Sequence, residues 1–201
     1  MRETRPREAL AQWWGARLER IADWLVEAER ARIAQTGRPA ARALEQQGEW
    51  KLPGDFLLKG RADRIERDMD GMVRIVDYKT GSVPAEKKVK AGTAPQLPLE
   101  AAMAEAGAFG EELRGQVAEL AYWHMTGGST PGKATMLFAG DAEQRAAAIA
   151  AAAEGLAALI DRFDDPARAY LSQPHPARAP RRADYAQLAR VAERATAGEP
   201  E

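Results

Sequence analysis

Two runs of alternating apolar and polar residues constrain the fold of this chain more than any other feature. The runs cover residues 56–66 and 72–80 and are separated by Asp70–Gly71. Alternation with a period of two is typical of half-buried β-strands, and an Asp-Gly pair between two such runs is typical of a hairpin turn. We therefore predict an antiparallel ribbon, with residues 49–52 leading into it.

The predicted ribbon carries charged residues at positions that such a strand half buries. Residues two apart on a strand point to the same face, so Asp77 and Lys79 project together and Tyr78 projects to the other side. A turn at Asp70–Gly71 places Asp63 opposite Asp77. Two facing carboxylates repel each other, and burying a charge without a partner costs several kcal/mol. The pattern therefore requires either a partner for each charge or a bound cation.

A divalent cation would turn this repulsion into attraction. Mg²⁺ and Mn²⁺ prefer carboxylate oxygens together with water, and the carbonyl of Tyr78 is a candidate for a further oxygen ligand. Lys79 lies beside the two aspartates in this arrangement, where it would hold a water molecule or offset negative charge on a phosphate. The residues thus predict a metal-dependent hydrolytic site built from Asp63, Asp77 and Lys79.

Composition excludes several other classes of protein. The chain has 201 residues and no cysteine, which excludes disulfides, a cysteine nucleophile and a cysteine-ligated iron–sulfur cluster within it. Its net charge is -1, so a nucleic-acid partner would need a local basic surface. No apolar run is long enough for a membrane span, and residues 1–14 lack the apolar core of a signal peptide. We therefore expect a cytoplasmic protein.

The remaining pattern predicts an α/β fold in which helices flank a small mixed β-sheet. We expect a single domain over residues 1–201. Its parts are an N-terminal helix, a β-rich core with an inserted helix, and C-terminal helices, over residues 7–36, 49–140 and 141–201 respectively. Because the first helix has no fold of its own before it, we also expect the chain to be one domain excised from a longer protein.

Within these parts we expect two further strands, two inner helices, one exposed loop and a short final helix. The strands fall at 115–127 and 134–140, the inner helices at 95–108 and 141–165, the loop at 80–94 and the final helix at 183–195.

The motif of the ribbon resembles a known family. Asp63, thirteen intervening residues, Asp77-Tyr78-Lys79 and then Thr80-Gly81 resemble the core of the PD-(D/E)xK nucleases, in the branch of RecB-like and Cas4-like enzymes. Gln96, at the start of the next predicted helix, resembles the glutamine of an additional motif of that branch. The tyrosine that follows in that motif is absent, and Glu100 or Ala101 stands in its place.

Over residues 57–103 the resemblance is greatest to the nuclease domain of the AddB family. It implies a restriction-endonuclease-like core and a DNA exonuclease that uses Mg²⁺ or Mn²⁺, with Asp63, Asp77, Lys79 and Gln96 at its site. It also implies that a helicase feeds single-stranded DNA to the site during double-strand break repair and recombination. The implied partners are DNA ends, an AddA-like helicase-nuclease subunit and the rest of a longer chain. A Cas4-type nuclease is a weaker alternative, because this chain lacks cysteines.

The resemblance further implies an acidic metal ligand on the helix before the ribbon. Glu27 and Glu29 are the candidates, and Glu29 is favoured because it resembles the glutamate that stands just ahead of an arginine pair in the family pattern. In the loop expected after the ribbon, Lys87, Lys88 and Lys90 are candidates for contacts with DNA phosphates.

A different class of function is a DNA-end-binding or subunit-docking module with a nuclease-like fold and no catalysis. The set of Asp63, Asp77 and Lys79 argues against it, because a site without turnover has no use for three costly charges. A structural ion pair is the simplest alternative for Asp77 and Lys79 alone.

Overall fold

The computed structural model describes residues 4–171, 174–175, 187–188 and 190. The predicted final helix over 183–195 lies almost entirely outside the described residues. Contacts divide the chain into two units, Met1–Ile160 and Asp161–Glu201. Every site residue predicted from the sequence belongs to the first unit.

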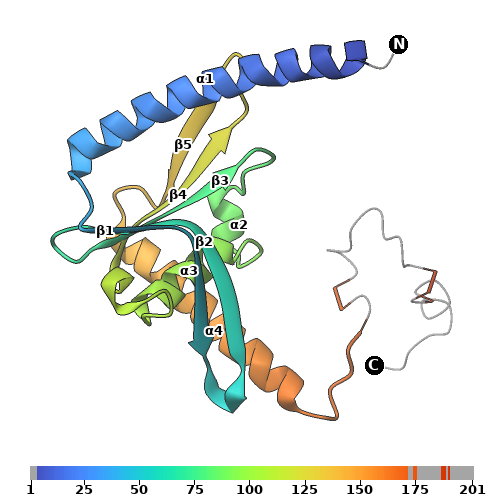
Figure 1. Cartoon of the computed structure of the whole chain (residues 1–201). Coiled ribbons are helices and arrows are strands. Elements are labelled where there is room, and N and C mark those ends of the chain that lie inside the picture. The colour runs from blue at the N-terminus through green and yellow to red at the C-terminus, as the bar shows by residue number, and fades with distance from the viewer. Residues whose placement is uncertain (1–3, 172–173, 176–186, 189, 191–201) are drawn as a thin grey trace. The chain divides into compact units, whose positions relative to one another are not determined.

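A five-stranded mixed sheet forms the centre of the first unit (Figure 1). Its strands follow one another in space in chain order. They are β1 (Ala41–Lys51), β2 (Leu57–Arg67), β3 (Val73–Lys79), β4 (Val117–Met125) and β5 (Gly132–Leu137). The pairs β1–β2, β2–β3 and β4–β5 are antiparallel, whereas β3 and β4 are parallel. The predicted α/β fold with a small mixed sheet is therefore confirmed.

The ribbon of β2 and β3 has the expected register. Arg64 pairs with Val76 and Ile65 pairs with Ile75, as a turn at Asp70–Gly71 requires. The structure corrects the sequence prediction before the ribbon, where β1 is a full eleven-residue partner of β2 and not a short lead-in. Six of its eleven residues are polar and its one leucine is exposed, so the sequence lacks the alternation of large apolar residues that would have indicated a strand.

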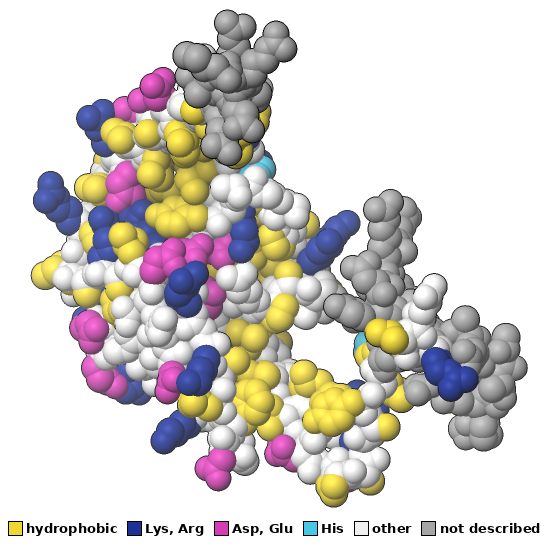
Figure 2. All heavy atoms as spheres, turned by 45° about the vertical axis from the view of Figure 1, so that its right-hand side comes forward, with side chains coloured by type: hydrophobic (Ala, Val, Ile, Leu, Met, Phe, Trp, Pro, Cys, Tyr) yellow, Lys and Arg dark blue, Asp and Glu magenta, His cyan; other side chains and the backbone are white. Residues whose placement is uncertain are grey.

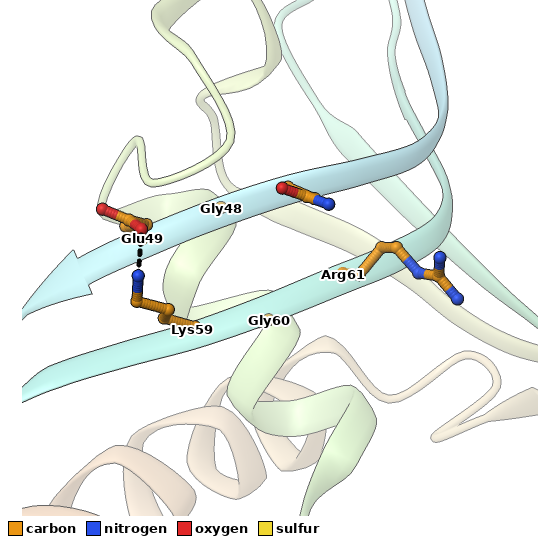
Figure 3. Close-up of a pocket in the computed structure, with 6 residues that line it drawn as sticks. Gly48, Glu49, Lys59, Gly60 and Arg61 are labelled. Atoms are coloured by element: carbon orange, nitrogen blue, oxygen red, sulfur yellow. Dashed lines mark ion pairs between the residues drawn. The ribbon is translucent and has the colours of Figure 1, made fainter.

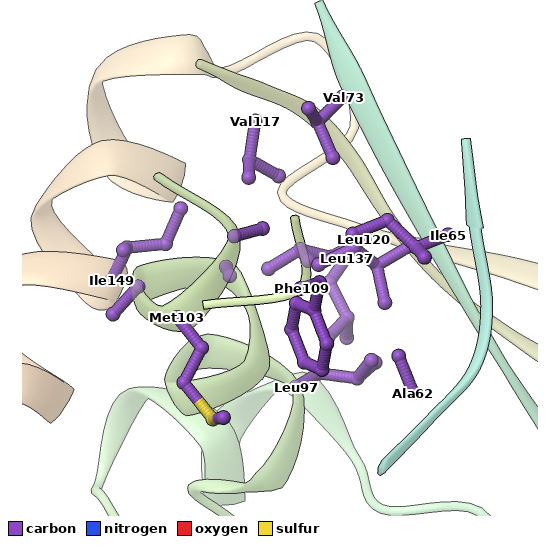
Figure 4. Close-up of a cluster of buried hydrophobic side chains, with 14 of the residues drawn as sticks. Ala62, Ile65, Val73, Leu97, Met103, Phe109, Val117, Leu120, Leu137 and Ile149 are labelled. Carbon is purple, nitrogen blue, oxygen red and sulfur yellow. The ribbon is translucent and has the colours of Figure 1, made fainter. Parts of the chain in front are cut away.

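One face of the sheet carries the main core, against helices α3 (Gln96–Glu105) and α4 (Ala142–Asp164) (Figure 4). Apolar side chains from β2 to β5, from the two helices and from the loop after α3 fill this core. They include Ile65, Ile75, Leu97, Met103, Phe109, Val117, Leu120, Leu137 and Ile149. The Phe109 ring lies so close to Gly48 of β1 that a Cβ there would stand 2.5 Å from it. Gly48 therefore lets the chain after α3 pack directly on the backbone of β1.

The opposite face of the sheet is covered by α1 (Thr4–Thr36), which confirms the predicted N-terminal helix. Trp24 of this helix packs against Trp123 of β4 with their ring centroids 5.6 Å apart. A Cβ on Gly132 of β5 would lie 2.2 Å from the Trp24 ring, so only glycine leaves room for it. The Arg20 Nε also donates to the Gly127 carbonyl at 2.8 Å. These contacts fix α1 on the sheet.

A short helix, α2 (Glu86–Lys90), occupies part of the stretch predicted as an exposed loop. Val89 anchors it by packing into the core at 4% exposure, and Glu86 accepts a hydrogen bond from the Phe138 N–H at 2.9 Å. The loop prediction was wrong here because a single buried valine among lysines gives no visible periodicity. Two 3-10 turns, Pro53–Asp55 and Glu111–Leu113, complete the connections. Within the described part of the chain, no helix has the length and apolar character needed to cross a membrane.

Candidate functional site

The predicted charged residues meet at the point where β2 and β3 separate, which we call the fork. The ladder between the two strands ends at Arg64 and Val76, and β2 continues beside β1 alone. At the fork, Asp63 Oδ2 accepts a hydrogen bond from the Tyr78 N–H at 2.9 Å. The Asp63 side chain thus takes the place of a backbone partner and is held next to Asp77.

Asp77 lies in the middle of the fork and is 1% exposed. The Lys79 ammonium is 2.9 Å from Asp77 Oδ1 and 2.7 Å from Oδ2. The contact with Oδ2 is a charge contact without the geometry of a hydrogen bond, and this buried oxygen has no other partner. Burial raises the pKa of Asp77, with a further increase from Asp63, although Lys79 and Gln96 act in the opposite direction. Lys79 therefore compensates the buried charge only in part.

Gln96 joins this pair from the first residue of α3. Its Nε2 donates to Asp77 Oδ1 at 2.8 Å, and its Oε1 accepts from the Lys79 ammonium at 3.3 Å. The structure thus brings Asp63, Asp77, Lys79 and Gln96 together, four residues drawn from three different elements.

Glu100 is a further residue at the fork that was not assigned to the site from the sequence. It lies one turn after Gln96 on α3, is 5% exposed, and accepts from Gln96 Nε2 at 3.1 Å. Burial raises its pKa to about 7, to which Asp77 and Asp63 contribute, while Gln96 opposes the rise. The sequence does contain a signal for it, because Glu100 is an acid on the otherwise apolar inner face of α3.

Tyr122 is a second residue that sequence reasoning did not assign to the site. It pairs with Asp77 across the β3–β4 ladder and is 1% exposed. Burial raises the pKa of Tyr122 to about 12, with contributions from Asp77 and Glu100. Nothing in the sequence marked it, since a tyrosine in an apolar strand is an ordinary core residue.

The structure does not bring Glu27 or Glu29 to the fork. Glu29 lies on α1, on the opposite face of the sheet, where its two oxygens accept from Arg64 at 2.7 and 2.9 Å. Burial alone would raise the pKa of Glu29, but the hydrogen bonds from Arg64 and Arg32 outweigh it and lower the pKa to about 2. Glu27 is exposed and pairs with Arg30. The expectation that the favoured Glu29 lies beside Asp63 and Asp77 is therefore not met.

The reason lies in the alternation of β2. Arg64 follows Asp63 directly and points to the face beneath α1, where at 4% exposure it needs carboxylate partners. Glu29 and Glu66 supply them. The cluster is completed by Arg32 and Arg42, both of which pair with Glu66.

The three predicted DNA-contacting lysines lie on α2, which follows β3 after a short turn. Lys87 and Lys88 are exposed, and Lys90 is exposed but pairs with Glu86 at 2.8 Å. On the face of the molecule in Figure 2, acidic and basic side chains are interspersed rather than separated. The described residues on the face in this view therefore form no extended basic surface.

The residues at the fork fit a hard divalent cation that keeps water in its coordination shell. Among the described residues, no group of three or more His, Cys, Asp or Glu side chains is arranged to hold a metal ion by itself. Mg²⁺, however, commonly binds through one or two carboxylates, with water and substrate phosphate as the other ligands. Asp63 and Asp77 supply two carboxylates, and Asp77 Oδ2 has no hydrogen bond. The Tyr78 carbonyl as a ligand stays a prediction.

A hollow of about 420 Å³ lies elsewhere, on the two-stranded arm of β1 and β2 (Figure 3). Residues 47–49 and 59–61 line it, and the Glu49–Lys59 ion pair of 2.7 Å crosses between the strands. Arg61, the other charged residue of the lining, pairs with Glu45 at 3.0 Å. The charged side chains that line the hollow are thus paired with one another or with Glu45, in contrast to those of the fork.

Comparison with known proteins gives two kinds of match. The family model described as the PD-(D/E)XK nuclease superfamily matches residues 1–189. Uncharacterized proteins of Rickettsia conorii and Rickettsia felis are each 40% identical over 62 residues, which are 29% of this chain and 7% of the relative. One of Rickettsia bellii is 46% identical over 44 residues, 22% of this chain and 5% of the relative. The matched stretches thus span only a small part of these relatives.

The family match and the geometry of the fork agree. The model covers nearly the whole chain, and the mixed sheet with its flanking helices brings the aspartates and the lysine of the sequence motif into contact. The chain belongs to the PD-(D/E)XK nuclease superfamily.

Proposed function

We propose that this protein is a metal-dependent deoxyribonuclease that hydrolyses phosphodiester bonds at the fork. The observation that carries the proposal is the contact of buried Asp77 with both Lys79 and Gln96, next to Asp63. Membership of a superfamily whose members are usually nucleases supports it. A structural ion pair alone would not need a second carboxylate beside it.

In the proposed reaction, Asp63 and Asp77 hold Mg²⁺ or Mn²⁺. The bound ion would stabilise charge on the phosphate and favour ionisation of a water molecule. Lys79 would donate to the attacking water or to a phosphate oxygen as negative charge develops. Gln96 keeps the Lys79 ammonium close to Asp77 through its carbonyl oxygen. No side chain forms a covalent intermediate in this scheme, so water attacks the phosphorus in line with the leaving oxygen.

The substrate proposed for the site is DNA, with the phosphate backbone contacted by α2. Lys87 and Lys88 are exposed cations on a helix that begins seven residues after Lys79. They are therefore our candidates for contacts with a strand bound at the fork. Lys90 would contribute less, because Glu86 already pairs with it. Contacts of this kind give affinity without sequence preference.

The finer assignment rests on the resemblance of residues 57–103 to AddB nuclease domains. On that ground we propose exonucleolytic cutting of single-stranded DNA delivered by a helicase, in double-strand break repair and recombination. The partner would be an AddA-like helicase-nuclease subunit. The curated relatives are far longer than the stretches they share with this chain, which is compatible with a nuclease domain within a larger polypeptide.

The test is a cleavage time course on end-labelled single-stranded DNA and linear double-stranded DNA, with Mg²⁺, Mn²⁺ or EDTA. The wild-type protein should cut with either metal and not with EDTA, and Asp77→Ala should not cut. Asp23→Ala, which changes an exposed aspartate on α1, is the matched control and should cut like the wild type. DNA binding without cleavage under every condition would instead indicate a non-catalytic DNA-end-binding or subunit-docking module.

A further inference from the structure

The inner face of α3 carries an acidic side chain, Glu100, that the proposed reaction does not use. Its helix neighbours Leu97, Ala101 and Ala104 are fully buried and apolar. Glu100 itself is 5% exposed, and its Oε2 is buried without a hydrogen-bond partner. Burying a carboxylate in this way is unfavourable, and an apolar side chain of similar size would be at least as stable there. The position of Glu100 therefore needs an explanation other than packing.

The one hydrogen bond that Glu100 does make is to the side-chain amide of Gln96. A primary amide has two N–H hydrogens and one carbonyl oxygen. The two donor contacts of Gln96 Nε2 go to Asp77 Oδ1 at 2.8 Å and Glu100 Oε1 at 3.1 Å. The carbonyl oxygen of the amide accepts from the Lys79 ammonium at 3.3 Å. With Glu100 in place, both donors and the acceptor are used, and the amide has one orientation.

Without Glu100 this orientation would depend on contacts at the edge of the site. Gln96 is the first residue of α3 and is exposed as a whole, so its amide can turn toward water. Lys79 has a flexible side chain that is 27% exposed, and its ammonium is held by Asp77 and Gln96. A Gln96 amide that turns away releases one of these two restraints on Lys79.

We propose that Glu100 is a positioning residue, which fixes the Gln96 amide so that Gln96 holds the Asp77 carboxylate and the Lys79 ammonium in place. The proposal rests on the proposed function, because the pair that it positions is the pair assigned to hydrolysis. Glu100 acts in it as a hydrogen-bond acceptor aimed at one amide hydrogen. Its role is therefore separable from its charge.

Two substitutions separate acceptor from charge. Glu100→Gln keeps a carbonyl oxygen at the same distance along the side chain, whereas Glu100→Leu keeps similar bulk and removes the acceptor. The Leu variant should lower kcat about ten- to hundredfold with little change in KM for DNA, as expected when a reacting group loses its position. The Gln variant should stay within about threefold of the wild type, because the acceptor is retained.

Gln96→Leu supplies the coupling test. Because Glu100 acts through Gln96, the double variant Gln96→Leu/Glu100→Leu should lose no more activity than Gln96→Leu alone. Losses that multiply in the double variant would overturn the proposal, as would wild-type kcat in Glu100→Leu. If the Leu variant of Glu100 does not fold, Glu100→Ala replaces it with the same expectations.

A second measurement does not depend on cleavage. The NMR signals of the Gln96 side-chain amide, assigned by their loss in Gln96→Leu, should show slow hydrogen exchange in the wild type and in Glu100→Gln. They should exchange rapidly in Glu100→Leu. Equal exchange in all three proteins would overturn the proposal. If the wild-type protein cuts no DNA, the proposed function fails, whereas this comparison still decides whether Glu100 orients Gln96.

Discussion

Glu100 is expected to make the metal-free protein less stable as the pH rises from about 4.5 to about 7. Burial raises the pKa of this carboxyl from 4.5 to about 7, with contributions from Asp77 and Asp63. The folded protein thus binds the proton more tightly than the unfolded chain does. The stabilisation is fully present below pH 4.5 and is lost as the pH rises through the folded-state pKa. At about 1.36 kcal/mol per pKa unit, the shift corresponds to about 3 kcal/mol of unfolding free energy.

The assay is urea unfolding in EDTA at a series of pH values from about 4.5 to 8, on the wild type and Glu100→Gln. Glutamine does not ionise, so the variant lacks this contribution, while all other carboxyl groups titrate in both proteins. The difference in unfolding free energy between the two proteins should therefore change by about 3 kcal/mol, in favour of the variant at high pH. EDTA keeps divalent cations away from the fork.

The upper end of the pH series provides an internal control, since the difference should level off near pH 8 as Glu100 becomes fully ionised. A difference that stays flat, within about 1 kcal/mol, from pH 4.5 to 8 would contradict the reasoning. It would mean that Glu100 is solvated in the folded protein, and that neither its burial nor its neighbours disfavour the charge.

Four further outcomes are expected. Millimolar Mg²⁺ or Mn²⁺ should raise the melting temperature, and Asp77→Asn should remove most of that rise; no shift in the wild type with either ion would contradict the carboxylate pair. Lys79→Ala should keep metal and DNA binding but cut about 10² to 10³ times more slowly, whereas early melting with normal cutting would indicate a structural ion pair. Charge reversal at Lys87 and Lys88 should weaken DNA binding and flatten its dependence on salt at an unchanged melting temperature, and an unaltered salt slope would remove α2 from the DNA-binding surface. Glu29→Gln should cost about 3 kcal/mol of stability and leave the metal-induced shift in melting temperature intact, whereas loss of that shift would restore Glu29 as a metal ligand.

The ribbon and the residues that it brings to the fork, Asp63, Asp77 and Lys79, were predictable because the information is local. A period of two, an Asp-Gly turn and the spacing between Asp63 and Asp77 fix which side chains meet, as the observed pairing of Arg64 with Val76 confirms. The partners on helices were predictable only in part. Gln96 was indicated by its place at the start of a helix that follows the ribbon, but α2 lies between β3 and α3, so its contact with Asp77 depends on tertiary packing.

The position of Glu29 was not predictable in the same way. Helical periodicity shows which residues share a face of α1, but not which strand that face covers or how far along the sheet it lies. Those are set by long-range packing, such as the contact of Trp24 with Trp123 and the space left by Gly132. The strand β1 was underestimated for a different reason, because an edge strand can be held by backbone hydrogen bonds with little apolar signal in its side chains.

The two faces of the sheet offer a comparison between buried ionic clusters. Beneath α1, Glu29 and Glu66 meet arginines from a helix and two strands, namely Arg32, Arg42 and Arg64. Charges there are compensated, and the pKa of Glu29 is lowered to about 2. Such a cluster connects α1 to the sheet and has its electrostatic requirements met by the protein itself.

At the fork the balance is the reverse. Asp77 contacts the Lys79 ammonium, whereas Asp63 accepts from the Tyr78 N–H and Glu100 from Gln96. Burial, with a contribution from neighbouring carboxylates, raises the pKa of both Asp77 and Glu100. Packing alone does not account for an excess of buried carboxylate, since apolar residues of the same size would avoid its cost. Titratable groups perturbed by both burial and specific neighbours are characteristic of functional sites. The negative charge of Asp63 and Asp77 is of the kind that a divalent cation would balance, and it lies on the face of the sheet where the sequence motif predicted it.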